Sequence, residues 1–234
     1  MAQKINPLSF RLGALQLWTD TLQKYGKIFT PYVLINYQKK QINNVFIHYL
    51  RSKELILDDT KVIIINHRVT VNIVCLELKK NSLTERKKLI LAEELRKILS
   101  QWFNSLVFIN FYFKKNWLSS AALTSNYIII LIDRKINTFK KTLQDNFRVL
   151  KNCVGIKKVV YYRKGVATLI LKGVKIYLSG CFDISRTQMS KTIKYNFGLL
   201  SLTKVNSYIE YSYKEIFTKY GVCSLRVWFF YEIE

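Results

Sequence analysis

The chain of 234 residues is 50% hydrophobic and 23% charged, a composition that excludes a wholly disordered protein and a coiled-coil rod. Its 38 Lys and Arg residues outnumber its 15 Asp and Glu residues, and the formal net charge of +23 points to a polyanionic partner, either nucleic acid or an acidic membrane surface. The longest uninterrupted apolar run, Tyr127 to Ile132, is far shorter than the roughly 20 residues that cross a bilayer, so no membrane insertion is expected.

The first part of the chain predicts an arm, a helix and a hairpin. Residues 1–19 show little periodicity and begin basic, which predicts an extended basic arm. Residues 31–55 carry spaced apolar residues among Lys and Gln, a pattern typical of a helix. Residues 61–66 and 69–78 resemble strands, and the short link between them predicts a hairpin.

A second helix and a third strand follow the hairpin. Ser82 and Glu85 have the spacing of a capping box, which predicts the start of a helix. Its buried stripe is expected to contain Leu91, Leu95, Ile98 and Trp102. Residues 106–113 alternate as a strand that ends the first domain, and residues 114–116 begin a linker.

The second half of the chain predicts two helices and then mainly strands. Residues 119–150 contain both helices, residues 183–203 are irregular and polar, and Trp228 is expected in the core. The strands are expected at residues 157–162, 166–171, 174–179, 205–213 and 224–231. The fold class is therefore α+β, with a mixed or antiparallel sheet in the second domain.

The positive charge is concentrated in the middle of the chain. Residues 79–164 carry 19 Lys and Arg residues and 5 Asp and Glu residues, mostly as basic doublets. Many closely spaced cations with few counter-charges favour phosphate binding, because each neutralised phosphate releases a condensed counterion.

The residues that usually carry chemistry are sparse. Four widely separated cysteines argue against a zinc site or a disulfide framework and favour a reducing compartment. Two histidines are too few for a conventional catalytic or metal cluster. We therefore expect no catalytic residue, no metal and no cofactor. Residues with A/T-rich codons, such as Lys, Ile and Asn, are favoured, as in a chain encoded by an organelle genome.

Both ends of the chain resemble a known family. The opening sequence MAQKINPLSFRLG (residues 1–13) is similar to the start of the bacterial-type ribosomal protein three of the small subunit, which begins Gly/Ala-Gln-Lys-Val-Asn-Pro and continues with Arg-Leu-Gly. Near the other end, Ser179-Gly180, Ile184-Ser185-Arg186-Thr187, Ile209-Glu210-Tyr211 and the segment from Tyr220 to Trp228 resemble its C-terminal motifs in order and spacing.

The resemblance implies the domain plan and the role. It implies an arm at residues 1–19, a type II KH-like RNA-binding domain at residues 20–115, and a C-terminal α/β ribosomal domain at residues 116–234, with insertions near residues 153–173 and 187–198 of the kind seen in mitochondrial members. It also implies a structural protein of the mitochondrial small ribosomal subunit, which is not an enzyme and needs no cofactor. Its expected partners are small-subunit rRNA in the head, mRNA at the entry channel and neighbouring head proteins, with no homo-oligomer.

Two motifs depart from the family pattern. A KH domain clamps nucleotides with a GXXG loop, but residues 78–82 contain no glycine, so we infer a clamp that has become a basic, electrostatic contact. Phe139-Lys140-Lys141 matches the family's Phe-Arg-Arg segment, which is credited with unwinding mRNA, whereas Gln144 replaces its next basic residue.

Contacts with RNA are expected through phosphates, which position the protein without reading sequence. The candidates lie in the arm, the loop after the hairpin, the helix at residue 140 and basic turns of the second domain. They are Lys4, Arg11, Lys79, Lys80, Arg134, Lys135, Lys140, Lys141, Arg163, Lys164, Arg186, Lys191 and Lys194.

Two other classes of protein are open alternatives. A nucleic-acid-processing enzyme would need paired carboxylates for a metal, and the adjacent pairs Asp58-Asp59 and Glu93-Glu94 diverge on a strand or a helix. A basic peripheral membrane protein would need one strongly amphipathic basic helix, whereas the doublets here are spread over helices, loops and strand ends.

Overall fold

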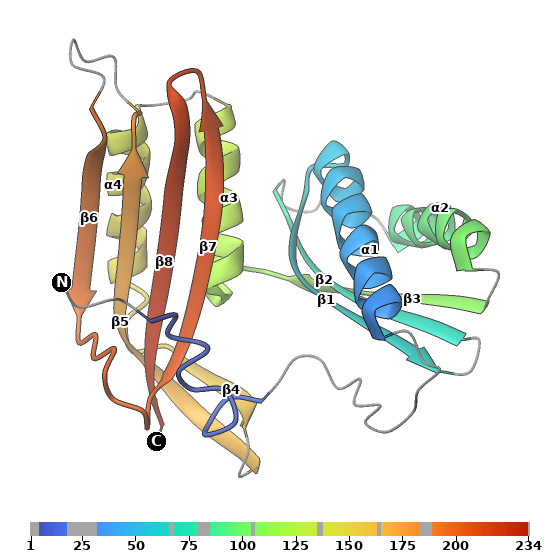
Figure 1. Ribbon diagram of the computed structural model, residues 1–234, viewed down its shortest axis with the longest axis horizontal. Helices are drawn as coiled ribbons and strands as arrows, with labels where there is room; N and C mark the ends of the chain where they lie inside the picture. Colours follow the sequence, from blue (N-terminus) through green and yellow to red (C-terminus); the bar gives the residue numbers. More distant parts are fainter. Residues whose placement is uncertain are drawn as a thin grey trace. The chain divides into compact units, whose positions relative to one another are not determined.

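A computed structural model of the protein describes residues 5–17, 32–65, 68–78, 85–103, 106–134, 138–162, 165–182 and 189–233. The chain divides into two compact units, one formed by Leu22–Ser119 and the other by Met1–Thr21 together with Ser120–Glu234 (Figure 1). Both combine helices with a sheet, so the predicted α+β class is confirmed.

The unit Leu22–Ser119 contains a three-stranded mixed sheet. Its elements are α1 (Tyr32–Ser52), β1 (Leu55–Ile65), β2 (Arg68–Glu77), α2 (Glu85–Phe103), β3 (Leu106–Lys114) and the short 3-10 helix η1 (Trp117–Ser119). The strand order is β1-β2-β3. Strand β2 is antiparallel to β1 and parallel to β3, because a tight link permits only an antiparallel neighbour whereas α2 provides the long crossover that a parallel pair requires.

Both helices of this unit pack on one face of the sheet. Alternate residues of β2, namely Val69, Val71 and Ile73, are buried between the apolar stripes of the helices. Those stripes contain Ile42, Phe46 and Leu50 of α1 and Leu91, Leu95 and Leu99 of α2. Trp102 lies on the same side of α2 as Leu91 and Leu95, but it belongs to the last turn of the helix and 51% of it is exposed, so its predicted core position is wrong.

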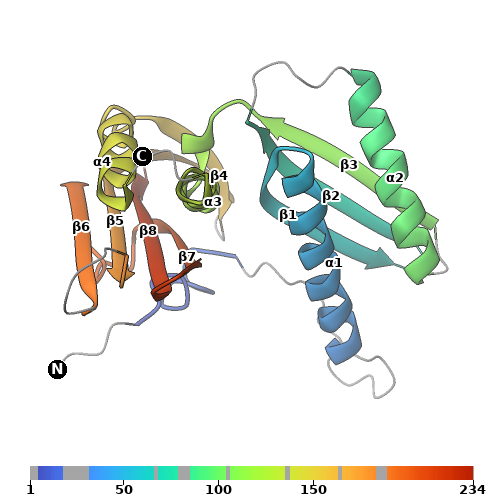
Figure 2. The ribbon, with the colours of Figure 1, turned by 90° about the horizontal axis from the view of Figure 1, so that it is seen from above.

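The second unit contains an antiparallel sheet of five strands. Its elements are α3 (Ala121–Asp133), α4 (Phe139–Lys151), β4 (Lys157–Tyr162), β5 (Gly165–Gly180), β6 (Lys191–Gly198), β7 (Tyr208–Thr218) and β8 (Gly221–Ile233). The strand order is β4-β5-β8-β7. Strands β4 and β6 share one edge of β5: β4 pairs with its first half and β6 with its second half. Helices α3 and α4 cover one face (Figures 1 and 2), and Trp228 is buried as predicted.

Two glycines allow the chain to pass closely where β6 leaves β5. A Cβ atom on Gly173 would lie 2.0 Å from the carbonyl oxygen of Leu199, and one on Gly198 would lie 2.0 Å from that of Lys172. Gly198 also has a φ of +75°, a conformation that L side chains rarely adopt. The register between β5 and β8 shifts at the same point, so this site is a bulge within one long strand.

The structure corrects four predicted elements. Strand β5 is continuous where two strands were predicted, because the bulge at Gly173 does not interrupt the pairing. Strand β6 lies in the segment predicted to be irregular, where its Tyr195 ring stacks on Phe147 of α4. Helix α1 ends at Ser52, and Leu55 begins a strand instead of ending the helix. Residues 5–17 form hydrogen-bonded turns, not an extended arm.

Candidate nucleic-acid interface

Arg11 was predicted to contact RNA, and the structure corrects that prediction. Its side chain is 0% exposed, and its guanidinium donates to the carbonyl oxygens of Pro7, Leu202, Lys204 and Ser207 at 2.7–3.0 Å. Burial lowers the pKa of Arg11 from its usual value. The five N–H donors of a guanidinium suit it to bind several carbonyls at once, so Arg11 fastens the N-terminal segment to the loop before β7.

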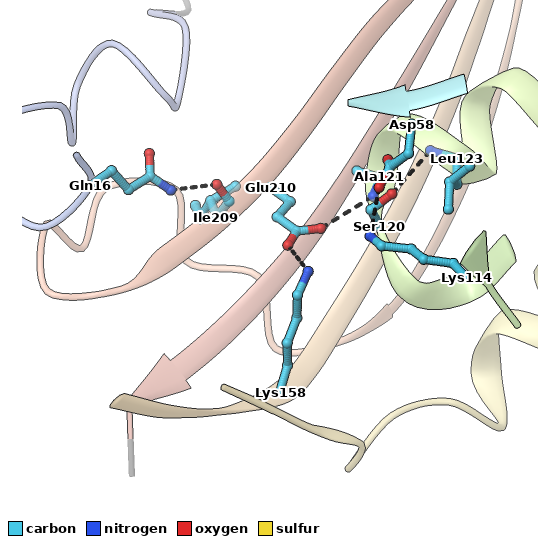
Figure 3. A network of polar contacts seen from close by, with 9 residues as sticks. All are labelled: Gln16, Asp58, Lys114, Ser120, Ala121, Leu123, Lys158, Ile209 and Glu210. Atoms are coloured by element: carbon cyan, nitrogen blue, oxygen red, sulfur yellow. Dashed lines mark hydrogen bonds and ion pairs between the residues drawn. The ribbon is translucent and has the colours of Figure 1, made fainter. Parts of the chain in front are cut away.

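Gln16 strengthens the same attachment. Its side-chain amide donates to the carbonyl oxygen of Ile209 at 2.7 Å (Figure 3). The segment 5–17 therefore lies against one end of the five-stranded sheet, on the face opposite α3 and α4 (Figure 2). A buried arginine and a buried glutamine thus fold a part of the chain that the sequence predicted to be extended.

Seven of the predicted contacts lie outside the described residues and stay predictions. They are Lys4, Lys79, Lys80, Lys135, Arg163, Lys164 and Arg186. The predicted capping box and the loop that replaces GXXG fall in the same undescribed ranges.

Helix α4 carries the two predicted cations Lys140 and Lys141 on its exposed side. The helix begins at its N-cap Thr138, whose side chain accepts a hydrogen bond from the backbone N–H of Lys141. Its opposite side is buried against the sheet through Thr142, Leu143, Asn146, Phe147 and Leu150. Packing of this stripe fixes the direction in which the cations point.

Two further cations complete this surface, and the sequence prediction missed both. At 100° per residue, Lys140, Lys141, Gln144, Arg148 and Lys151 fall within an arc of about 100°, and all five are exposed. The Lys151 ammonium lies 5.3 Å from the centroid of the Phe147 ring and 5.5 Å from that of Phe197, which holds its position. We call Lys140, Lys141, Arg148 and Lys151 the α4 cationic face; helical periodicity, applied beyond the matched motif, would have found all four.

The remaining described candidates are separated. Arg134 is the exposed C-cap residue of α3. Lys191 and Lys194 are both exposed on β6, but three residues apart on a strand they point to opposite faces of the sheet. The segment of Lys191 and Lys194 is therefore a regular strand, and the RNA contact predicted for both lysines stays a prediction.

Some basic residues of the doublets are already paired within the protein. Lys158 binds the carboxylate of Glu210, whose other oxygen accepts a hydrogen bond from the backbone N–H of Ala121 at 3.2 Å (Figure 3). In the other unit Lys114 lies 2.5 Å from the carboxylate of Asp58, which is almost fully buried. This pairing also uses one carboxylate of the Asp58-Asp59 pair, and the described residues contain no group of acidic, His or Cys side chains that could hold a metal ion.

Comparison with known proteins identifies the family. The small ribosomal subunit protein uS3m of Chondrus crispus is 34% identical over 237 residues, which cover 99% of this chain and 94% of that protein. The chain belongs to the uS3 family of small ribosomal subunit proteins. The uS3 protein of Baumannia cicadellinicola subsp. Homalodisca coagulata is 25% identical over 98% of the chain, and uS3m of Acanthamoeba castellanii is 27% identical over 81% of it and 65% of that protein. No family model matches the chain.

Membership in the uS3 family confirms the resemblance predicted from the two ends of the sequence. The family consists of structural ribosomal proteins, which confirms the prediction that the chain is not an enzyme. Two of the relatives carry the mitochondrial designation uS3m, which supports the predicted mitochondrial location. In the described part of the chain no helix has the length and apolarity needed to span a bilayer.

Proposed function

We propose that the protein is a structural constituent of the mitochondrial small ribosomal subunit, where it binds rRNA in the head and helps to form the mRNA entry channel during translation. Its partners are then small-subunit rRNA, mRNA and neighbouring head proteins. Family membership supports the ribosomal role, and the α4 cationic face is the observation that carries the RNA contact.

The α4 cationic face has the properties of a phosphate-binding surface. Four cations line a helix of 13 residues, about 20 Å long at 1.5 Å per residue. The first turn contains no acidic residue, so Lys140 and Lys141 add to the positive end of the helix dipole, which favours a nearby anion. The carboxylate of Asp145 lies 3.8 Å from Arg148, but such an exposed pair contributes little and leaves Arg148 able to bind phosphate.

The domain assignment is part of the same proposal. Residues 20–115 form a KH-like module in which α1, α2 and the sheet of β1, β2 and β3 provide the scaffold, and Lys79 and Lys80 replace the nucleotide clamp by electrostatic contact. Residues 116–234 form the ribosomal C-terminal domain, with insertions near residues 153–173 and 187–198. The three-stranded mixed sheet with both helices on one face supports the assignment of the first module.

The test compares charge reversal on α4 with a matched reversal elsewhere. The double variant Lys140→Glu, Lys141→Glu should lose rRNA protection in footprints of the intact subunit and enter small subunits less efficiently. The control is Arg96→Glu, Lys97→Glu, which changes the charge equally on the exposed side of α2 and should preserve both. The wild-type chain should co-sediment with small subunits in a sucrose gradient of mitochondrial lysate.

Two results would contradict the proposal. Unchanged protection and incorporation in the α4 variant would remove the α4 cationic face from the interface. A wild-type chain that floats with anionic liposomes and is absent from ribosomal fractions would favour the peripheral membrane alternative instead.

A further inference from the structure

The face of the five-stranded sheet opposite α3 and α4 is covered at one end and open at the other. At the covered end Ile209 and Phe230 are fully buried, and Leu200 and Leu202 of the loop that Arg11 fastens pack against their cluster. The N-terminal segment crosses this end of the sheet (Figure 1). Along the same face of β7, exposure then increases through Tyr211 to Tyr213, which is 45% exposed. In Figure 1 this face points toward the viewer, with α3 and α4 behind it, and its uncovered end is the upper part of the sheet.

Cations and tyrosines alternate across this open end. The cross-strand partners are Lys194 on β6, Tyr177 on β5, Arg226 on β8 and Tyr213 on β7, and we call these four residues the cation–tyrosine row. The Lys194 ammonium lies 5.5 Å from the Tyr177 ring centroid. The Arg226 guanidinium lies between two rings, 5.8 Å from the centroid of Tyr177 and 5.6 Å from that of Tyr213.

The charges of this row are held in place but not neutralised. Across the described part of the chain, neither Arg226 nor Lys194 has a carboxylate within ion-pair distance, and the buried Nε of Arg226 has no hydrogen-bond partner. The nearby Glu215 carboxylate instead accepts a hydrogen bond from the Tyr213 hydroxyl at 3.0 Å. A guanidinium held between two rings is partly desolvated, which strengthens its attraction to an anion.

We infer that the cation–tyrosine row is a second RNA contact, which binds a single-stranded segment through its phosphates and unpaired bases. Arg226 and Lys194 are suited to phosphate oxygens, and the exposed Tyr213 ring gives a base a surface for stacking. An acidic peptide would use the cations but not the tyrosine ring, so the alternation favours a nucleotide. The inference rests on the proposed function, since it names an additional surface for the same class of partner.

The geometry also indicates how much RNA the row accommodates. Neighbouring strands lie about 4.8 Å apart, so Lys194 and Tyr213, which are separated by three strand intervals, lie about 14 Å apart. A four-stranded sheet with exposed aromatic residues holds two or three bases in other RNA-binding modules. We therefore expect a short unpaired segment, not a duplex.

The test measures binding of the full chain to a fluorescent oligouridine of about ten nucleotides over a range of salt concentrations. The variant Arg226→Gln, Lys194→Gln loses two phosphate contacts, so the slope of log K against log salt should fall by about 1.4, which weakens binding about 25-fold at 0.1 M salt. The control Arg96→Gln, Lys97→Gln removes the same charge from α2 and should change neither value. Tyr213→Leu should weaken binding about tenfold without changing the slope, because it removes only stacking.

Further measurements keep the result independent of folding. Arg226→Lys retains the charge and should retain the slope, and Lys194→Gln alone changes only an exposed side chain and should lower the slope by about 0.7. Equal slopes for the double variant and the control would overturn the inference, as would equal competition by polyaspartate, which would indicate an acidic protein partner. The α4 variant is tested for subunit incorporation in parallel. If the row variants bind RNA normally but the α4 variant enters subunits poorly, the inference about the row fails and the proposed function is retained.

Discussion

The substitution Arg11→Met should release the N-terminal segment from the rest of its unit. Methionine fills much of the space of the arginine stem but donates no hydrogen bond. Four carbonyl oxygens, of Pro7, Leu202, Lys204 and Ser207, lose the donor that the guanidinium provides. The bonds to Pro7 and Ser207 are buried, whereas those to Leu202 and Lys204 are partly buried.

The size of the effect follows from these acceptors. A buried carbonyl left without a donor costs about 1–3 kcal/mol, and the two partly buried carbonyls can recover bonds with water. Counting the two buried acceptors at the middle of this range gives a loss of about 4 kcal/mol, and removal of the buried charge reduces it to about 3 kcal/mol. Opening of the segment should therefore increase by about two orders of magnitude.

Hydrogen exchange of residues 5–17 and 199–207 measures this opening directly. Arg11→Lys keeps the charge but has three donors on one point instead of five on a planar fork, so it should fall between the wild type and Arg11→Met. Arg148→Met is the matched control, because the Arg148 side chain is 70% exposed, and it should change the free energy of unfolding by less than about 0.5 kcal/mol. Exchange in Arg11→Met equal to that of the wild type would refute the role assigned to Arg11.

Two further predictions concern stability. Gly198→Ala should lower the free energy of unfolding by at least about 2 kcal/mol more than the control Gly155→Ala. Both glycines have positive φ, but only at Gly198 would the new Cβ meet backbone, 2.0 Å from the carbonyl oxygen of Lys172. Equal urea midpoints for the two variants would contradict this close approach. Burial raises the pKa of Cys75 to about 12 and also raises that of Tyr231. The unfolded chain releases these protons at lower pH than the folded chain. The two groups therefore contribute their full stabilising free energy below pH 9.0, the ordinary pKa of Cys75, and this contribution declines as the pH rises toward the pKa values of the folded state. A urea midpoint independent of pH above 9.0 would contradict this prediction.

Local sequence patterns predicted most helices and strands of this fold because each carries its own periodicity. The apolar stripe of α2 and the alternation of β3 are visible within a few residues. Strand β6 was missed although Ile193, Tyr195 and Phe197 alternate with Thr192, Lys194 and Asn196, because this short run lies in a polar segment and little of it is buried. Its stability depends on Phe147, which lies 48 residues away from Tyr195 in the sequence and stacks on it in the fold.

The candidate interface was predictable in composition but not in geometry. Helical spacing places Arg148 and Lys151 beside Lys140 and Lys141, so the α4 cationic face was within reach of the sequence. The alignment of Arg226 with Lys194 was not, because it depends on the register of β5 with both β6 and β8. Register between distant strands is set by packing and turn geometry, which no local pattern contains.

The difference between Arg11 and Arg226 shows why a basic residue cannot be assigned to RNA by its charge alone. Arg11 uses its donors on protein carbonyls and is closed to solvent, whereas Arg226 lies between two rings with its Nε unpartnered. The 15 acidic residues could neutralise no more than 15 of the 38 basic residues one to one, so at least 23 cations must find another anion or repel one another. Pairs such as Lys158 with Glu210 remove particular cations from that surplus. We therefore expect the proposed RNA interface to depend on cations that the fold holds in place without using their charge in a buried ion pair.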